Sequence, residues 1–565
     1  MPVIGVNLED FLSLLGAETT LEEIEETLPM MGVAWEGRTE DGFSIEVCPN
    51  RPDMLSIEGL ARAYASFTGL RTGLRPYGAK ESNYATVVER RVEAVRPYFA
   101  SAVIKHIEFD DALIRSIMQM QEKLHITHSR KRRKVSIGLH NLKPIRFPVT
   151  YTARPPDFSF RPLGERRKMT QAEILSELPK GAEYAWILEG KEEYPILMDA
   201  KEMVLSMPPI INSEHTRIDE ATEDIFVDVT ATEPKAMNEV LNILVTTFAD
   251  RGAEIYAVEV KYHDHTEMTP DLSPRKMELE NSYVNRTLGL ELTLRETTGY
   301  LERMGYGVPE SGIMADAARG GSLTAQVPSY RTDIMHPIDL VEDVAIAYGY
   351  GNFVPEIPGI ASPAGEEPLE VFCRRLRNFL VGFGFLETMT FMMTNKRNLF
   401  ERMCLPEEPL AETENPKTRE YNVLRNRILP SLMEVLSLNK HHTYPQNLFE
   451  VDDVVLLDDA EETGARTARR LAVALCHGRA NFSEAKAVMN SILGNLGLTK
   501  VEAEAAGPPC FIEGRRLVAK VHGRPICWAG ELRPEALERW RLEMPVAGLE
   551  MDVDALFGLT LKGED

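Results

Sequence analysis

The sequence predicts a multidomain protein that combines α+β and α/β units, and three observations predict it. The chain has 565 residues, of which 44% are apolar and 27% charged, so it can form three to five ordinary domains. Strand-like and helix-like periodicities alternate along the chain. A segment rich in proline and glycine, 351–368, separates the C-terminal third from the rest, as a linker does.

Residues 1–75 are expected to form a small N-terminal α/β unit. Strands are predicted at 2–6 and 43–47. Thr20 and Glu23 have the spacing of a capping box, which predicts a helix starting there. A second helix is expected from Ser56 to near Thr68, because its apolar residues fall on one face.

Residues 76–270 are expected to form an α+β domain, and residues 271–354 a small helical domain. The expected strands of the first are 102–107, 135–139, 185–188, 225–229 and 255–260, and its helices 112–123 and 237–251. The small domain is expected to hold helices 292–304 and 337–348 and a strand at 323–327. Residues 355–565 alternate helices and strands again and form the last unit.

Composition excludes several classes of protein. No run of about 18 apolar residues occurs, so no membrane span is expected. The N-terminus lacks the pattern of a secretory signal, and the six cysteines form no C-x-x-C pair, so we expect a cytoplasmic protein with reduced thiols. A net charge of −24 means that any contact with RNA is made by a local basic patch or by a partner chain.

Four carboxylates lie close together in the small domain. Asp339, Glu342 and Asp343 share one face of a helix start at i, i+3 and i+4, and Asp333 lies just upstream. Mg²⁺ prefers oxygen ligands of this kind. Acidic residues in a first helical turn are also favoured by the helix dipole without any metal, and the spacing alone leaves both interpretations open.

The residues around this cluster resemble a known family. The sequence VPSYRTDI at 327–334, followed by DLVED at 339–343 and AYGY at 347–350, resembles the small domain of the beta subunit of phenylalanyl-tRNA synthetase. The segment NRPD at 50–53 is similar to the first domain of that family, in its shorter archaeal and eukaryotic form, and the resemblance extends over nearly the whole chain. It implies a magnesium site with Asp333, Asp339, Glu342 and Asp343 as ligands.

The resemblance implies that residues 76–270 are a tRNA-editing domain, which removes tyrosine wrongly attached to tRNA(Phe). Such a site needs small polar groups to hold an ester and a water, and Asn212, Ser213 and Thr230 are the candidates. No histidine base flanks them, and the alternative is that they make loop and strand-end hydrogen bonds.

One dense basic run interrupts this acidic chain. It consists of Arg130, Lys131, Arg132, Arg133 and Lys134. These residues are our candidates for a contact with tRNA phosphates. Charge runs are more often solvated loops, and this alternative stays open.

The C-terminal unit resembles the class II synthetase fold, an antiparallel sheet with helices, but without the catalytic chemistry. An active class II domain uses two arginines to bind the ATP phosphates. The corresponding stretches here end in Glu450 and contain Glu550, and neither supplies an arginine. The fold can persist without the activity.

The resemblance therefore implies the beta subunit of a phenylalanine–tRNA ligase with two alpha and two beta chains. The alpha subunit would perform the ATP-dependent aminoacylation of tRNA(Phe), and this chain would supply editing, Mg²⁺ and the assembly surface. Two other classes remain: a purely structural or binding protein, and a stand-alone metal-dependent hydrolase that uses the acid cluster.

Overall fold

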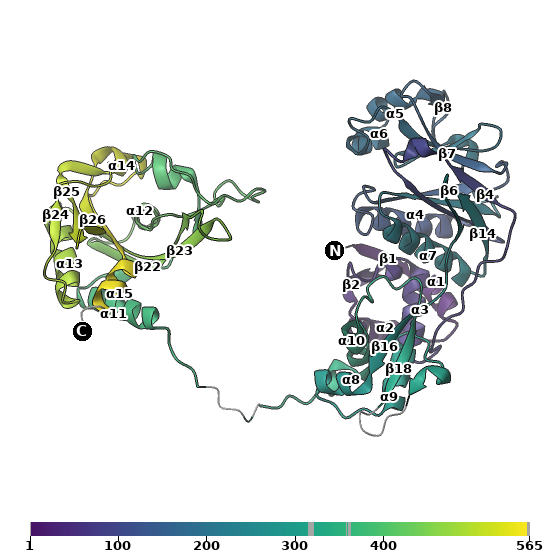
Figure 1. Cartoon of the computed structure of the whole chain (residues 1–565), viewed down its shortest axis with the longest axis horizontal. Helices are drawn as coiled ribbons and strands as arrows, with labels where there is room; N and C mark the ends of the chain where they lie inside the picture. The colour runs from purple at the N-terminus through teal and green to yellow at the C-terminus, as the bar shows by residue number, and fades with distance from the viewer. Residues whose placement is uncertain (1, 315–320, 358, 360–362, 562–565) are drawn as a thin grey trace. The chain divides into compact units, whose positions relative to one another are not determined.

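The computed structural model describes residues 2–314, 321–357, 359 and 363–561. The chain divides into two compact units, Met1–Ile357 and Pro358–Asp565, both of which mix helices with sheets (Figure 1). The prediction of a mixed α/β multidomain protein is therefore confirmed.

The N-terminal part of the first unit has a three-stranded antiparallel sheet in the order β1-β3-β2. The expected capping box is present, since Thr20 Oγ1 accepts from the Glu23 amide at 3.2 Å and Glu23 Oε2 accepts from the Thr20 amide at 2.9 Å. Its elements are β1 (Val3–Asn7), α1 (Leu8–Leu15), α2 (Leu21–Met30), β2 (Ala34–Thr39), β3 (Gly42–Glu46) and α3 (Ile57–Phe67).

A ten-stranded sheet forms the middle of the first unit, in the order β12-β11-β10-β7-β4-β14-β5-β13-β6, with β15 paired to β14. Its strands are β4 (Ala85–Val88), β5 (Tyr98–Lys105), β6 (Val135–Asn141), β7 (Val149–Arg154), β10 (Tyr194–Met198), β11 (Val204–Met207), β12 (Ile211–Asn212), β13 (Ile225–Ala231), β14 (Glu254–Lys261) and β15 (Thr266–Thr269). Its helices are α4 (Asp111–Ile126), α5 (Gln171–Glu177), α6 (Pro179–Tyr184) and α7 (Pro234–Asp250), and a short ribbon joins β8 (Ser159–Phe160) to β9 (Met169–Thr170).

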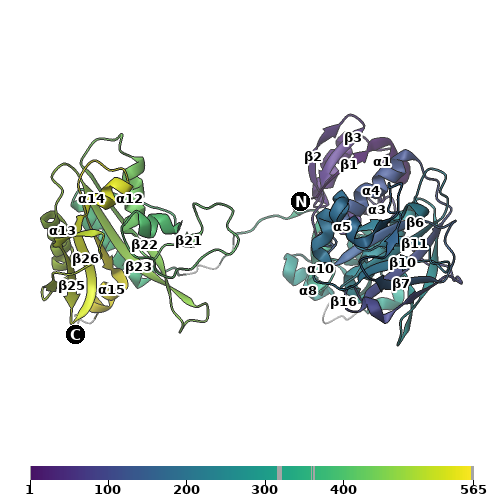
Figure 2. The same ribbon diagram turned by 90° about the horizontal axis from the view of Figure 1, so that it is seen from above.

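This sheet curls until its two ends meet. One apolar core joins strands from both halves, with Phe99 of β5 against Tyr151 of β7 at 5.1 Å between ring centroids. At the seam, Asn212 Nδ2 on β12 donates to the carbonyl of Leu139 on β6 at 3.1 Å. The opposite face of β5, β6 and β13 is covered by α4 and α7. Both helices lie beside β6 in Figure 1, and Figure 2 shows α4 beside β6 from above.

The strand expected at 185–188 is wrong, because the structure has a 3₁₀ turn at Ala185–Ile187 instead. A short apolar run does not distinguish a strand from a helical turn. Here Leu188 and the partly buried Ile187 pack into a small core beside α5 and α6.

The last part of the first unit is less helical than expected. Helices α8 (Asn281–Leu288), α9 (Leu294–Arg303) and α10 (Pro337–Tyr348) pack with a three-stranded antiparallel sheet in the order β16-β18-β17. Its strands are β16 (Arg275–Glu280), β17 (Ile313–Met314) and β18 (Ser322–Val327). Strand β16 was not predicted, because its sequence, RKMELE, contains only two apolar residues among four charged ones.

The second unit holds a seven-stranded sheet in the order β19-β22-β23-β27-β26-β25-β24, antiparallel except for the pair β19–β22. Its strands are β19 (Leu386–Glu387), β22 (Gln446–Leu457), β23 (Ala465–Cys476), β24 (Glu502–Glu504), β25 (Phe511–Val521), β26 (Arg524–Leu532) and β27 (Val546–Asp552), and a separate ribbon pairs β20 (Met393–Thr394) with β21 (Val423–Leu424).

Helices cover both faces of this sheet. One core forms beneath α11 (Pro368–Gly382), α13 (Phe482–Asn495) and α15 (Val553–Leu561). The other forms beneath α12 (Leu429–Leu438) and α14 (Pro534–Arg539). The expected linker, 351–368, falls partly on residues 358 and 360–362, which lie outside the described residues.

Among the described residues, no helix combines the length and the apolar character that crossing a membrane requires.

Candidate functional site

A cavity of about 480 Å³ opens where the curled sheet of the first unit closes. Its walls come from α4, β6, β13 and the turn between β11 and β12. The lining residues with polar side chains are Gln121, Glu122, Arg132, Ser136, Lys180, Ser206, Asn212 and Asp228. The cavity lies within the size range of small-ligand sites.

Of the three predicted editing residues, only Asn212 lines this cavity. Ser213 is buried and caps a 3₁₀ turn, accepting from the His215 amide at 3.2 Å and donating to the Arg161 carbonyl at 3.2 Å. Thr230 is fully buried, and its hydroxyl accepts from Arg96 Nε at 2.9 Å. In this structure Ser213 and Thr230 therefore make loop and strand hydrogen bonds.

Asp228 and His140 form a buried polar chain that the sequence analysis missed. His140 Nε2 lies 2.7 Å from Asp228 Oδ2, and His140 Nδ1 lies 2.8 Å from the hydroxyl of Thr216. Asp228 also lines the cavity, opposite Gly138 on the neighbouring strand. A Cβ at Gly138 would lie 1.9 Å from Asp228 Oδ2, so only glycine leaves room for this carboxylate. The signal was a charged residue inside the apolar strand IFVDVTA.

Two polar atoms at the cavity are buried and have no hydrogen-bond partner within the described part of the chain. They are the hydroxyl of Ser206 and Nε of Arg132. Buried polar atoms are usually paired, and unpaired ones require an explanation such as a ligand. Their position beside Asn212 and Asp228 makes this cavity the best-supported binding site of the first unit.

The basic run divides between this cavity and the surface. Arg130, Lys131 and Arg132 all have left-handed backbone, with φ of 48°, 52° and 64°. This turn exposes Arg130 and Lys131 but buries Arg132, whose Nη1 donates to the carbonyls of Pro209 at 3.2 Å and Ile210 at 3.0 Å. Arg132 is therefore not part of the exposed basic surface.

Two residues of the run line a second, larger groove of about 910 Å³. Arg130 and Lys134 line it together with Lys123 and Lys235, while Arg133 is exposed nearby. Lys134 forms a close ion pair with Glu233.

The acid cluster is organised around one buried arginine. Arg331 donates from Nε and Nη2 to the two oxygens of Asp333 at 2.8 and 2.7 Å, and from Nη2 to Asp343 at 2.8 Å. Tyr306 donates a short hydrogen bond to Asp343. Burial opposes ionisation of Asp333, but the charge and hydrogen bonds of Arg331 hold its pKa below the usual range.

The other two carboxylates have separate environments. Asp339 caps its own helix, since its Oδ2 accepts from the amides of Met335 and His336, each at 2.7 Å. Glu342 lies at the surface, although neighbouring groups shield part of its carboxylate from water. This partial burial, followed by the charges of Asp343 and Asp339, raises its pKa. Within the described part of the chain, no group of three or more His, Cys, Asp or Glu residues is arranged to hold a metal ion. As they stand, these four side chains do not form a magnesium-ligand set.

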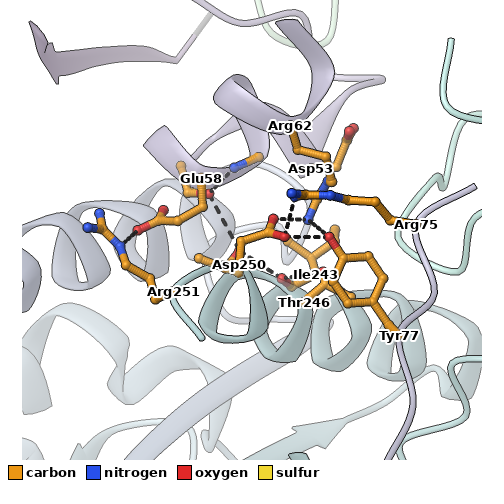
Figure 3. Close-up of polar contacts among 12 residues, drawn as sticks. Asp53, Glu58, Arg62, Arg75, Tyr77, Ile243, Thr246, Asp250 and Arg251 are labelled. Carbon is orange, nitrogen blue, oxygen red and sulfur yellow. Dashed lines mark hydrogen bonds and ion pairs between the residues drawn. The ribbon is translucent and has the colours of Figure 1, made fainter. Parts of the chain in front are cut away.

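A second buried network, of ion pairs and hydrogen bonds, holds the N-terminal part of the first unit against α7 (Figure 3). Asp250, at the end of α7, accepts from Arg62 at 2.7 Å, Arg75 at 2.6 Å and Tyr77 at 2.6 Å. Arg251 donates to Glu58 of α3 at 2.6 Å. These contacts fix α3 against α7 and keep the parts of the first unit together.

In the second unit, the two glutamates at positions expected for arginines are both buried. Glu450 accepts from Arg425 Nη1 at 2.8 Å and from the Thr390 hydroxyl. Glu550 accepts from the amides of Ile428 at 3.1 Å and Leu429 at 3.0 Å, at the start of α12. Both carboxylates therefore make hydrogen bonds that stabilise the second unit.

Comparisons with known proteins agree with this architecture. The family model described as the tRNA synthetase B5 domain matches residues 277–350, and that of the phenylalanyl tRNA synthetase beta chain CLM domain matches residues 355–553. A solved N-terminal fragment of the phenylalanyl-tRNA synthetase beta-subunit from Pyrococcus horikoshii is 36% identical, covers 61% of this chain and 99% of the fragment, and has a TM-score of 0.58. These findings define an aminoacyl-tRNA synthetase chain.

Two full-length relatives specify the family. The phenylalanine–tRNA ligase beta subunit of Archaeoglobus fulgidus is 41% identical over 560 residues, with 99% of both chains covered. That of Pyrococcus abyssi is 38% identical over 563 residues, with 99% of this chain and 100% of the relative covered. The chain belongs to the family of phenylalanine–tRNA ligase beta subunits.

Proposed function

We propose that this chain, as the beta subunit, acts with an alpha subunit to form Phe-tRNA(Phe) from ATP, phenylalanine and tRNA. The match over its whole length to beta subunits carries this proposal. We further propose that the tetramer holds two alpha and two beta chains, that it works in the cytoplasm, and that the aminoacylation site lies in the alpha chain. The second unit is then a class II synthetase-like domain in which glutamates stand where arginines would bind ATP phosphates.

Phenylalanine-dependent pyrophosphate exchange tests this division of labour. We expect no exchange by this chain alone and exchange when the alpha chain from the same genome is added. Exchange by the isolated chain would place an active site in the second unit, and no exchange by the mixture would contradict the assignment.

The editing proposal rests on the cavity of the first unit. Asn212 lies in its wall with Asp228 and Ser206, and all three could contact the ester and a water. Ser213 and Thr230 would act only by supporting the fold around it. We expect Asn212→Ala to slow hydrolysis of Tyr-tRNA(Phe) by about 10-fold or more, the usual effect of losing a positioning group. Ser176→Ala, on α5 and outside both this cavity and the second groove, should retain the wild-type rate.

Magnesium at the acid cluster is a proposal from the family resemblance. Carboxylates outnumber arginines around Arg331, and the pKa of Glu342 is raised first by burial and then by the charges of Asp343 and Asp339. Metal analysis of the purified chain, and thermal melting with and without millimolar Mg²⁺, test it. Wild type should gain stability from Mg²⁺ and Glu342→Gln should not. A wild-type chain without Mg²⁺ and without a shift would favour the capping interpretation of these acids.

The second groove is our proposed contact with tRNA. Its wall includes Lys123, Arg130, Lys134 and Lys235, and Arg130 and Lys235 are exposed. We expect Arg130→Ala to weaken tRNA binding by the assembled enzyme and to reduce its salt dependence, because each phosphate contact releases counterions. Filter binding at several salt concentrations measures both effects.

The exposed apolar surface of the second unit is our proposed docking surface for the alpha subunit. Among the described residues, strand β19 pairs only with β22. Around it, Phe383, Leu386, Met389 and Phe391 are 41%, 67%, 93% and 75% exposed. Clusters of large apolar side chains at a free sheet edge are typical of protein interfaces.

A further inference from the structure

A cavity of about 390 Å³ opens on one face of the seven-stranded sheet in the second unit. Its floor is formed by strands β23, β26 and β27, and its rim by the segments before α12 and before β25. No role proposed above uses it.

The body of this cavity is apolar. Trp528, Phe511, Leu429 and Met403 line it. Two glycines face each other across β26 and β27, Gly530 opposite Gly548, and a Cβ at Gly548 would lie 3.0 Å from Leu429 Cδ1. A Cβ at Gly530 would lie 2.4 Å from Phe511 Cγ, so the glycine leaves room for this ring to pack closely against the strand.

Two buried charges of opposite sign reach the same cavity. Glu550 is 7% exposed, and only its Oε2 is used, by the amides of Ile428 and Leu429. Among the described residues, its Oε1 accepts no hydrogen bond. On the neighbouring strand, Arg470 is 9% exposed, and its Nη1 is buried without an aligned hydrogen bond, although it lies 3.0 Å from Asp552 as an ion pair.

The remaining charges at the rim compensate each other. Arg427 pairs with Glu408 at 2.7 Å. The lining therefore has two arginines and two glutamates and no net charge. A polyphosphate would bring several negative charges next to Glu550 and Glu408, which opposes its binding.

We propose that this cavity binds a small zwitterion with an apolar body, of the class of α-amino acids with an aromatic or large aliphatic side chain. The carboxylate pairs with Arg470, the ammonium with the free oxygen of Glu550, and the side chain lies between Trp528 and Phe511. The volume suits a ligand of this size. The ammonium gives Glu550 Oε1 a hydrogen-bond donor, and the carboxylate gives Arg470 a second acceptor beside Asp552. This proposal is independent of the editing proposal, which concerns a cavity in the first unit.

Calorimetric titration of the isolated full-length chain with L-phenylalanine and two matched probes tests the proposal. Phenethylamine lacks the carboxylate and 3-phenylpropionate lacks the ammonium, while all three share the aromatic body. We expect saturable binding of L-phenylalanine and about tenfold weaker binding of each analogue, because each loses one charge-assisted hydrogen bond. Equal affinity for the three probes, or no saturable binding of L-phenylalanine, would overturn the proposal.

Three variants locate the binding. Glu550→Gln keeps an amide oxygen for the α12 amides but loses the charge, and should abolish the advantage of L-phenylalanine over 3-phenylpropionate. Glu531→Gln, on the same strand as Trp528 but outside the cavity lining, should bind as wild type does. Asn212→Ala alters the first-unit cavity and should also leave binding unchanged. Loss of binding in Asn212→Ala with retention in Glu550→Gln would place the ligand in the first unit and overturn the proposal.

Discussion

At the residue scale, two arginines of the first unit each pair with an aspartate two residues further along the chain. The sequence analysis grouped Asp333 with three other acids, but it did not foresee that Arg331 lies between Asp333 and Asp343. Arg51 and Asp53 form the same bidentate Arg-x-Asp pair in the N-terminal unit, with bonds of 2.9 and 2.8 Å. An arginine two residues from an aspartate is a local signal, and it was available from the sequence.

A first prediction at this scale concerns Asp250. Its side chain is 5% exposed and forms ion pairs with Arg62 and Arg75 (Figure 3). Asp250→Ala removes the carboxylate that is hydrogen-bonded to the buried Arg62, so we expect the free energy of unfolding to fall by about 3–5 kcal/mol. Urea unfolding of the full chain measures it. Glu22→Ala, which removes an exposed partner of Arg38, should leave the free energy of unfolding close to that of wild type.

His125 gives a prediction for pH. Burial, and then the nearby charges of Arg132 and Lys180, hold the pKa of His125 well below its usual value, and its Nε2 accepts from the Ile137 amide at 3.0 Å. The unfolded chain therefore binds a proton below about pH 6.5 that the folded chain does not, so stability falls as pH decreases from there.

His125→Gln still offers an acceptor to Ile137 but does not titrate. We expect its stability to lose about 1.4 kcal/mol less per pH unit than wild type between about pH 6.5 and 5. Unfolding curves at several pH values measure the difference. The exposed His441→Gln should follow wild type, and parallel curves for wild type and His125→Gln would contradict the assignment.

At the element scale, strand pairing creates the first-unit cavity. Strand β6 places Gly138 opposite Asp228 of β13, and the carboxylate occupies the space of the missing side chain. Each strand was predictable from its apolar residues, but this pairing was not, because β6 and β13 are separated by much of the domain.

Gly138→Ala tests that arrangement. Its Cβ would lie 1.9 Å from Asp228 Oδ2, so the carboxylate must move away from His140. We expect a loss of stability of about 1–3 kcal/mol, together with slower Tyr-tRNA(Phe) hydrolysis. Gly78→Ala, where no heavy atom lies within 4 Å of the added Cβ, should be close to neutral in both measurements.

At the scale of the whole molecule, the two units carry different proposed roles. The first holds the cavity with Asn212 and Asp228, and the second has buried glutamates and an exposed apolar edge. This division agrees with a subunit that edits and assembles while its partner performs the ligation.

The apolar edge makes the prediction at this scale. Met389→Lys places a charge where a side chain is 93% exposed, so the isolated chain should fold as before. If the alpha subunit buries this residue, the affinity of the variant chain for the alpha subunit should fall about tenfold or more. Analytical ultracentrifugation of the mixture measures it. Met30→Lys in the first unit, 56% exposed, is the matched control, and equal assembly of the two variants would place the interface elsewhere.

The sequence by itself determined the class of fold, most helices and strands, and the family. Helix α10 was predicted with the bounds that the structure has, because a first-turn proline and apolar spacing are local signals. Only the tertiary structure decided which polar residues share a cavity. Asn212 lines the cavity with Asp228 and Ser206, which the sequence analysis did not select, whereas Thr230 lies beside Arg96. The physical reason is that side-chain chemistry follows from local sequence, while the meeting of two distant strands depends on the packing of the whole domain.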